Sequence, residues 1–176
     1  MKNKLKKLLM RVLVKGDFIL TSGKRSAFYI NGRSITLTPE GAYLSANLLM
    51  EILKKHKATA VGGPTVGADP IVGALSYFAH TKQYSLKTFI VRKSQKSHGD
   101  KKLLEGPELY EKDKIILVDD TTTTGKSLIE SAQILRARGL KVSEAVVLVD
   151  REEGAKENLQ KIDIKLISLF TAKDLL

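Results

Sequence analysis

The sequence predicts an α/β protein whose mostly parallel central sheet is flanked by helices on both faces. Short apolar runs of the kind found in buried strands alternate along the chain with longer segments whose apolar residues recur at helical spacing. The 176 residues match the usual size of one domain, and 43% of them are hydrophobic, which is enough for an ordinary core. We therefore expect a single domain, 1–176, with no room for a second enzyme.

A helix, a hairpin and a second helix are predicted over the first third of the chain. The first helix is predicted from apolar residues that recur at helical spacing and so lie on one face: Leu5, Leu8, Leu9, Val12 and Leu13. Two short strands are expected at 18–21 and 26–30, on either side of a Ser-Gly turn. Thr38 has the character of an N-cap before Pro39, which predicts a helix that extends to about His56.

Strands and helices continue to alternate from residue 58 onward. An apolar run at 58–62 precedes the loop 62–67 and an apolar helix that ends near Ala79. Close backbone approach and positive φ are permitted at three positions of this loop, Gly62, Gly63 and Gly67. A strand at 115–118 should lead to a helix that Gly139 terminates. Further strands are expected at 86–91, 145–149 and 164–169.

Composition and charge exclude several classes of site. The chain has no cysteine, which excludes disulfides, thiolate nucleophiles and cysteine-ligated metals, and its three scattered histidines argue against a histidine metal site. No apolar run reaches the roughly 18 residues of a membrane-spanning helix, so we expect a cytoplasmic protein without a membrane partner. The net charge of +11 favours a polyanionic partner. The basic segment 1–15 is interpreted as an amphipathic helix that packs on the body of the protein with its lysines in solvent, and a mitochondrial presequence is the open alternative.

A run of acids and hydroxyls directly follows the expected strand 115–118. It comprises Asp119, Asp120, Thr121, Thr122, Thr123, Thr124, Gly125, Lys126 and Ser127. Hydroxyls and the N–H groups of a helix N-terminus can bind a phosphate, while the two carboxylates can accept hydrogen bonds from sugar hydroxyls. A nucleoside triphosphatase P-loop is a competing interpretation, but Asp120 stands where that motif needs its first glycine. A plain helix cap explains one acid and one hydroxyl, and leaves the rest of the run unexplained.

The run from Ile115 to Ser127 resembles the signature of the type I phosphoribosyltransferases. The resemblance implies that Asp119 and Asp120 lie along the ribose hydroxyls of phosphoribosyl pyrophosphate (PRPP) and that the turn 121–127 binds its 5′-phosphate. It also implies that family's fold, with a small hood over the sheet built from an N-terminal element of about residues 1–35 and the C-terminal segment.

The basic segment after the expected strand 86–91 is similar to the catalytic loop of one branch, the orotate phosphoribosyltransferases. Its matching cations are Arg92, Lys93, Lys96 and His98. The resemblance implies that these cations bind the pyrophosphate of PRPP, that Lys96 and His98 act in catalysis with Asp119 and Asp120, and that the loop is shared across a homodimer. Without the acid pair, a solvated loop would explain this segment equally well.

Two further segments resemble the same branch. The resemblance places orotate against Lys24, Phe28, Tyr29, Thr123 and Arg151, and a guanidinium suits a planar anion because its donors form a fixed fork. The chain departs from some members at Thr21 and at Thr65-Val66-Gly67, where those members carry lysines. The contacts of those lysines to pyrophosphate therefore have no direct counterpart here, but the loop 62–67 can still supply backbone N–H groups near the pyrophosphate.

The resemblance implies transfer of the phosphoribosyl group from PRPP to orotate, giving orotidine 5′-monophosphate and pyrophosphate in pyrimidine biosynthesis. It implies Mg²⁺ as the cofactor, carried by the substrate and held by Asp119 and Asp120 through water. No covalent intermediate and no nucleic-acid partner are expected. Two alternatives stay open: a phosphoribosyltransferase for another base, and a non-catalytic nucleic-acid-binding regulator on the same fold, which the charge of +11 would suit.

Overall fold

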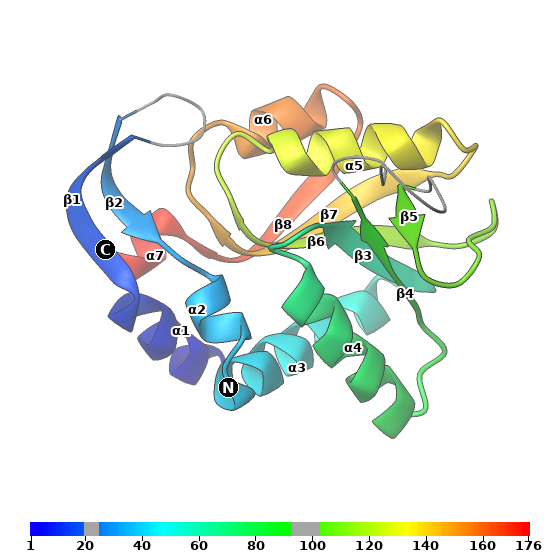
Figure 1. The fold of residues 1–176 in the computed structure, drawn as a ribbon, viewed down its shortest axis with the longest axis horizontal. Coiled ribbons are helices and arrows are strands. Elements are labelled where there is room, and N and C mark those ends of the chain that lie inside the picture. The colour runs from blue at the N-terminus through cyan, green and yellow to red at the C-terminus, as the bar shows by residue number, and fades with distance from the viewer. Residues whose placement is uncertain (20–24, 93–102) are drawn as a thin grey trace, which may run out of the picture.

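The computed structural model of the chain describes residues 1–19, 25–92 and 103–176. Its central feature is a six-stranded sheet with the strand order β5-β4-β3-β6-β7-β8 (Figure 1). The strands are β3 (Ala60–Pro64), β4 (Lys87–Val91), β5 (Leu104–Glu105), β6 (Ile115–Thr122), β7 (Val142–Asp150) and β8 (Lys165–Thr171). The β4 and β5 strands run antiparallel, and the other neighbouring strands of this sheet run parallel. The prediction of a mostly parallel sheet is therefore confirmed.

Helices cover both faces of this sheet (Figure 1). The helices are α3 (Pro39–Lys55) and α4 (Asp69–Thr81) on one face, and α5 (Lys126–Arg136) and α6 (Ala155–Gln160) on the other. Side chains alternate along a strand, so Ile116 and Val118 of β6 join the apolar cluster of α3 and α4, whereas Ile115 and Leu117 join that of α5 and α6. Burial on both faces explains why this strand is continuously apolar in sequence.

Local signals set the ends of two long helices as predicted. The hydroxyl of Thr38 accepts a hydrogen bond from the Gly41 N–H at 3.1 Å, and Pro39 occupies the first turn of α3. At the end of α5, Gly139 has a φ of +75°, and the Leu140 N–H donates to the Leu135 carbonyl at 3.2 Å. Glycine adopts this left-handed conformation without steric cost, which lets the chain leave the helix.

The N-terminal segment forms a second, two-stranded sheet beside the main one (Figure 1). Its elements are α1 (Lys2–Arg11), β1 (Leu13–Ile19), β2 (Arg25–Ile30) and α2 (Arg33–Thr36). The side chains of Leu5 and Leu9 are fully buried in the cluster that includes α3. The helix α1 also contacts the C-terminal helix α7 (Ala172–Leu175). The two ends of the chain therefore pack together on one side of the molecule.

Several predicted boundaries are wrong, and each has a local cause. Leu13 belongs to β1 and not to the first helix, because β1 pairs with β2 from its first residue. The segment 62–64 extends β3 because it pairs with β4, and no positive φ is found at Gly62, Gly63 or Gly67. The short elements β5, α2, α6 and α7 were not predicted. They contain too few residues to show a periodic pattern.

The order of the strands creates a crevice at one edge of the sheet. From β3 the chain moves outward to β4, and it then returns to place β6 on the opposite side of β3. The connections that follow β3 and β6 therefore separate above the carboxyl ends of these two neighbouring strands. Ligands of open α/β sheets bind at such a switch point. Among the described residues, no helix is both long enough and apolar enough to cross a membrane.

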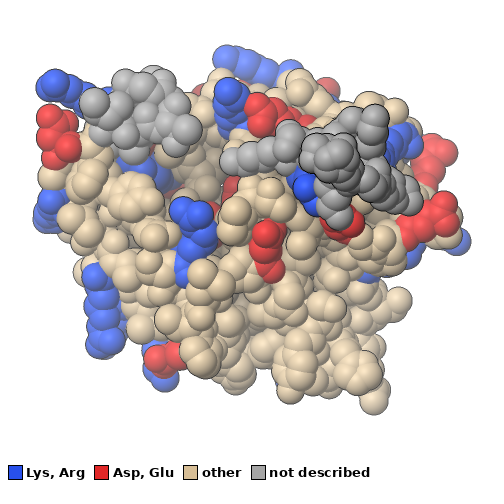
Figure 2. Space-filling model, in the orientation of Figure 1, with Lys and Arg blue, Asp and Glu red and all other residues tan. Residues whose placement is uncertain are grey.

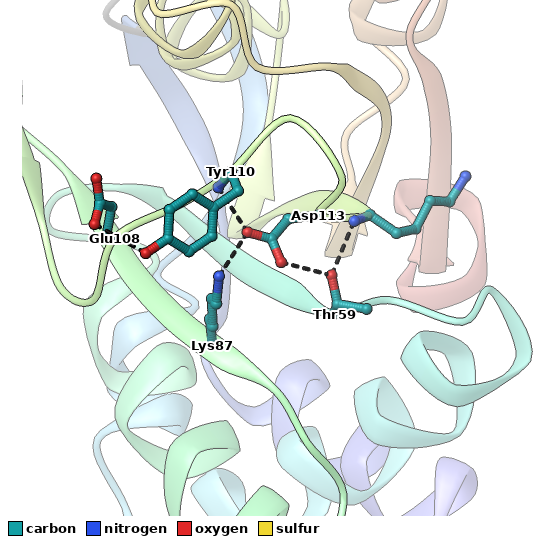
Figure 3. Close-up of polar contacts among 6 residues, drawn as sticks. Thr59, Lys87, Glu108, Tyr110 and Asp113 are labelled. Carbon is teal, nitrogen blue, oxygen red and sulfur yellow. Dashed lines mark hydrogen bonds and ion pairs between the residues drawn. The ribbon is translucent and has the colours of Figure 1, made fainter.

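A buried carboxylate joins the opposite, amino-terminal edge of the sheet (Figure 3). Asp113, before β6, accepts hydrogen bonds from the Lys87 ammonium at 2.7 Å, the Tyr110 N–H at 2.7 Å and the Thr59 hydroxyl at 3.1 Å. The Lys87 ammonium also lies 4.3 Å from the centre of the Tyr110 ring. These contacts tie β3, β4 and β6 together far from the crevice.

Candidate active site

The two acids of the central motif are held at the carboxyl end of β6. Asp119 and Asp120 are 8% and 6% exposed and belong to the strand itself, which extends to Thr122 and not only to Val118 as predicted. The Asp120 N–H donates to Asp119 Oδ1 at 2.9 Å, and the Thr121 N–H donates to Asp120 Oδ1 at 2.7 Å. One oxygen of each carboxylate is thus fixed by the backbone of the motif.

Glycines from two other segments lie directly against these carboxylates. A Cβ atom on Gly67, in the loop after β3, would collide with the Oδ1 atoms of both Asp119 and Asp120. A Cβ on Gly32, after β2, would lie 2.7 Å from Asp120 Oδ2. The sequence predicted close backbone approach at Gly67, though toward pyrophosphate and not toward the acid pair, and it gave no role to Gly32. The peptide bond between Thr65 and Val66 in the first of these segments is cis.

The turn between β6 and α5 presents a helix N-terminus to the crevice. Gly125 has a φ of +79° and occupies the N-cap of α5, an 11-residue helix. The Asn158 amide donates to the Thr124 carbonyl at 3.0 Å, which fixes the turn from α6. Lys126 is exposed and lies 3.9 Å from Glu130. The first N–H groups of α5 and the threonine hydroxyls form a suitable site for a phosphate.

Arg151, immediately after β7, lines the same crevice as the turn. Its side chain is 3% exposed, its N–H donates to the Thr122 carbonyl at 3.0 Å, and its guanidinium donates to the Phe28 carbonyl at 2.9 Å. The guanidinium carbon also lies 4.8 Å from the centre of the Phe28 ring. Arg151 therefore forms part of the wall of the crevice.

The carboxylate that precedes Arg151 is also shielded from water. Asp150, the last residue of β7, is 7% exposed. Burial raises the pKa of its carboxyl group, and the hydrogen bond from the Glu152 N–H opposes this rise. The residues around the end of β7 are therefore fixed by contacts within the chain.

These elements enclose one cavity of about 870 Å³. Among the predicted site residues, the cavity is lined by Tyr29, Asp119, Asp120, Thr121, Thr122, Thr123, Thr124, Gly125, Lys126, Ser127 and Arg151. Residues without a predicted role also line it: Phe18, Ile30, Asn31, Gly32 and Arg33. The loop 62–67, which was predicted to allow close backbone approach, contributes Pro64, Thr65, Val66 and Gly67. The Phe18 and Tyr29 rings lie 5.8 Å apart. The residues 31–33, which directly follow the hairpin, had one signal in the sequence: the basic side chain of Arg33, which could have indicated an anion site.

Some predicted site residues lie elsewhere. Phe28 contacts Arg151 but does not line the cavity. Arg92 lines a second space of about 470 Å³, which shares Pro64 and Ser127 with the first, and its guanidinium lies 3.2 Å from Glu105. Four predicted residues lie outside the described ranges: Lys24, Lys93, Lys96 and His98. The Thr21 departure lies there too.

Comparisons with known proteins assign a family to this arrangement. The sequence model of the phosphoribosyl transferase domain matches residues 34–171. Over 176 residues the chain is 40% identical to an orotate phosphoribosyltransferase of a Nostoc species, covering 99% of this chain and 85% of the relative. It is 42% identical to that of Methanocaldococcus jannaschii, covering 99% and 96%. These coverages include the whole of the crevice.

A solved structure with the same fold was found as well. It is the Mycobacterium tuberculosis orotate phosphoribosyltransferase in complex with PRPP, with a TM-score of 0.80 and 29% identity, covering 99% of this chain and 98% of that one. The expected phosphoribosyltransferase fold is thereby confirmed. The chain belongs to the orotate phosphoribosyltransferases, a branch of the phosphoribosyl transferase domain family.

Proposed function

We propose that this chain transfers the 5-phosphoribosyl group from PRPP to orotate and releases orotidine 5′-monophosphate and pyrophosphate, a step of pyrimidine biosynthesis. The proposal rests on one observation: a buried acid pair, a helix N-terminus and a buried arginine line the same cavity. These groups match a sugar, a phosphate and a planar anion respectively. Kinship with orotate phosphoribosyltransferases at 40% identity selects orotate as the base.

The reaction breaks the bond from the anomeric carbon to pyrophosphate and forms a bond from that carbon to a ring nitrogen of orotate, which releases its proton. Asp119 and Asp120 accept hydrogen bonds from the ribose hydroxyls and face the positive charge that develops on the sugar. The N-terminus of α5, with Thr123, Thr124 and Ser127, binds the 5′-phosphate. Arg151 directs its donors at orotate. No residue of the cavity is required as a covalent nucleophile in this scheme.

The acid pair also suits Mg²⁺. No cluster of three or more metal-ligating side chains is found among the described residues, so the chain offers no all-protein cage there. Mg²⁺ keeps several waters and binds through one or two carboxylates together with substrate phosphates. Asp119 and Asp120 would hold such an ion through water, and the ion would neutralise charge on the departing pyrophosphate. We expect turnover to stop in excess chelator and to return with added Mg²⁺; full turnover in chelator would contradict this assignment.

We further propose that residues 1–176 form a single domain in which the element of about residues 1–35, with α7, is the hood over the cavity. The contacts of Phe28 with Arg151 support this arrangement, because they join the hairpin to the end of β7. Phe18 and Tyr29 of the same hairpin line the cavity. Removal of residues 1–30 should abolish orotate binding; retained binding would contradict a hood. The expected cytoplasmic location stays a prediction.

A homodimer is proposed as the working form. Aromatic side chains are exposed on the outer surface of α3 and α4: Tyr43 on α3 and Tyr77 on α4 are 51% and 68% exposed, and the centres of both rings lie within 6.0 Å of the centre of the Phe78 ring. Figure 2 shows the surface over the lower part of α4 without charged side chains. Val66, 57% exposed, lies between this helix and the cavity. A second copy seated here would stand next to the mouth of the cavity, as a shared loop requires.

Product analysis tests the proposed function against its alternatives. The protein is incubated with PRPP, Mg²⁺ and one of orotate, uracil, adenine or hypoxanthine, and the nucleotide formed is identified by mass. Orotidine 5′-monophosphate from orotate alone is the expected result. A purine nucleotide would support a phosphoribosyltransferase for another base. Absence of any nucleotide, together with salt-dependent binding to nucleic acid, would support the regulator.

A further inference from the structure

Glu153 faces the buried guanidinium of Arg151 from the turn after β7. Its Oε1 atom lies 3.0 Å from Arg151 Nη2, and the two side chains are 19% and 3% exposed. A buried guanidinium without a counter-charge is strongly unfavourable. The Glu153 carboxylate therefore supplies the counter-charge that a buried Arg151 needs, unlike the weak ion pairs on the surface of a protein.

The neighbouring acids of the turn have other partners. Asp150 Oδ1 accepts a hydrogen bond from the Glu152 N–H at 2.9 Å. The Glu152 carboxylate lies 3.1 Å from the Lys173 ammonium of α7. Hydrogen bonding to Lys173 holds the pKa of the Glu152 carboxyl below its ordinary value. The turn thus directs one acid toward the C-terminal helix and the next toward the arginine.

Three contacts from two segments, the hairpin and the turn after β7, define the plane and the direction of the Arg151 guanidinium. The Phe28 ring covers one of its faces at 4.8 Å, the Phe28 carbonyl accepts one N–H at 2.9 Å, and Glu153 holds the same Nη2 edge from the turn. Such a guanidinium loses little freedom when a planar ligand binds, because its orientation is already set.

We propose that Glu153 is a positioning residue for orotate recognition, acting through Arg151. The inference rests on the proposed function, since it takes Arg151 as the group that contacts orotate. The carboxylate holds the guanidinium in the plane that the base requires and supplies its counter-charge. Glu153 itself need not touch orotate or PRPP.

The position of this pair predicts a selective kinetic effect. Without the carboxylate, Arg151 can turn away from orotate, and a small misplacement of a substrate-positioning group costs roughly 10-fold to 100-fold. In the proposed scheme the acid pair and the α5 N-terminus hold PRPP, whereas the partner of Glu153 is Arg151, the group that contacts orotate. The KM for orotate should therefore rise while the KM for PRPP stays within a factor of about two.

The test compares three variants with the wild-type protein: Glu153→Ala, Glu153→Gln and the matched control Glu152→Ala. Steady-state KM values for orotate and PRPP, kcat and the melting temperature are measured for each. For Glu153→Ala we expect an orotate KM about 10-fold higher. Glu153→Gln keeps an acceptor for the guanidinium and should recover most of this loss. Glu152→Ala should leave both KM values unchanged, although it loses the contact to α7.

The outcomes separate this inference from the proposed function. If the wild-type protein does not convert orotate, the proposed function fails first. If it does, an unchanged orotate KM in Glu153→Ala, or an equal rise in both KM values, overturns the positioning role. Should Glu153→Ala not fold, Glu153→Gln decides alone: an orotate KM about 3-fold higher with an unchanged PRPP KM supports the role, and unchanged values for both contradict it.

Discussion

At the scale of single residues, the approach of Gly67 to the acid pair gives the most direct test of the site's geometry. Its φ is not in the left-handed region, so alanine is compatible with the backbone, but a Cβ would collide with both carboxylates. We expect Gly67→Ala to lower kcat/KM by about 100-fold, because the acids must move from their productive positions. Steady-state kinetics measure the loss of activity, and a melting curve measures any loss of stability separately.

Gly73 offers a matched control for this substitution. It lies in α4, and a Cβ there would meet no atom within 4 Å. Gly73→Ala should leave kcat/KM unchanged and raise the free energy of unfolding by about 0.5–1 kcal/mol, since alanine is the better helix former. If Gly67→Ala and Gly73→Ala were equally active, displacement of the two acids would not affect turnover. That result would contradict the role given to the acid pair.

The sequence revealed some residues of the site and could not reveal others. Asp119 to Ser127 were predicted because they are contiguous, so their chemistry is visible without a fold. Gly32 and Arg33 come from a separate segment, and only the tertiary fold brings them to Asp120 and the cavity. The burial of Arg151 was also invisible in the sequence, because it depends on the hairpin that carries Phe28.

At the scale of elements, the network at the amino-terminal edge of the sheet should stabilise the fold without affecting chemistry. Burial by itself raises the pKa of Asp113, but the hydrogen bonds from Lys87, the Tyr110 N–H and Thr59 outweigh burial and hold this pKa below its ordinary value. A carboxyl with a lowered folded-state pKa contributes stability above its unfolded pKa. That contribution is lost as the pH falls through the folded-state value.

Asp113→Asn should therefore lower the free energy of unfolding at pH 7 by roughly 2 kcal/mol. The difference from the wild type should shrink as the pH falls from the unfolded-state pKa of an aspartate, about 4, toward the lower folded-state pKa of Asp113. Denaturant unfolding at several pH values measures this. Glu108→Gln is the control, since this exposed residue meets the network at its edge, where its carboxylate accepts a hydrogen bond from the Tyr110 hydroxyl. A constant difference between Asp113→Asn and wild type at every pH would contradict the account.

Element type was predictable wherever the pattern was long. The helix after Thr38 and the buried strand at Ile115 each show a pattern of apolar residues over several positions. The first residue of each was therefore predicted to within a few residues. The end of β6 was missed because Asp119 and Asp120 look like loop residues in sequence. They remain in the strand because β7 pairs alongside them as far as Thr122. Pairing across a sheet overrides local preference.

At the scale of the whole molecule, the exposed aromatic face predicts the assembly state. Tyr77→Lys places a charge where a second copy would bury an aromatic ring, and the dissociation constant of the dimer should rise at least about 10-fold. Light scattering over a dilution series measures the mass. Met10→Lys, at a 46% exposed position on α1, is the control and should leave the mass unchanged. A wild-type protein that is monomeric at micromolar concentration would contradict the proposal.

The loss of orotate ultraviolet absorbance on addition of PRPP and Mg²⁺ tests the central claim most directly. The account predicts that the wild-type protein consumes orotate and releases an equal amount of pyrophosphate. It also predicts that Asp120→Asn lowers kcat/KM by about 100-fold while the fold is retained. If the wild-type protein binds PRPP but leaves orotate unchanged, or if Asp120→Asn turns over at the wild-type rate, the assignment of this cavity as an orotate phosphoribosyltransferase site is contradicted.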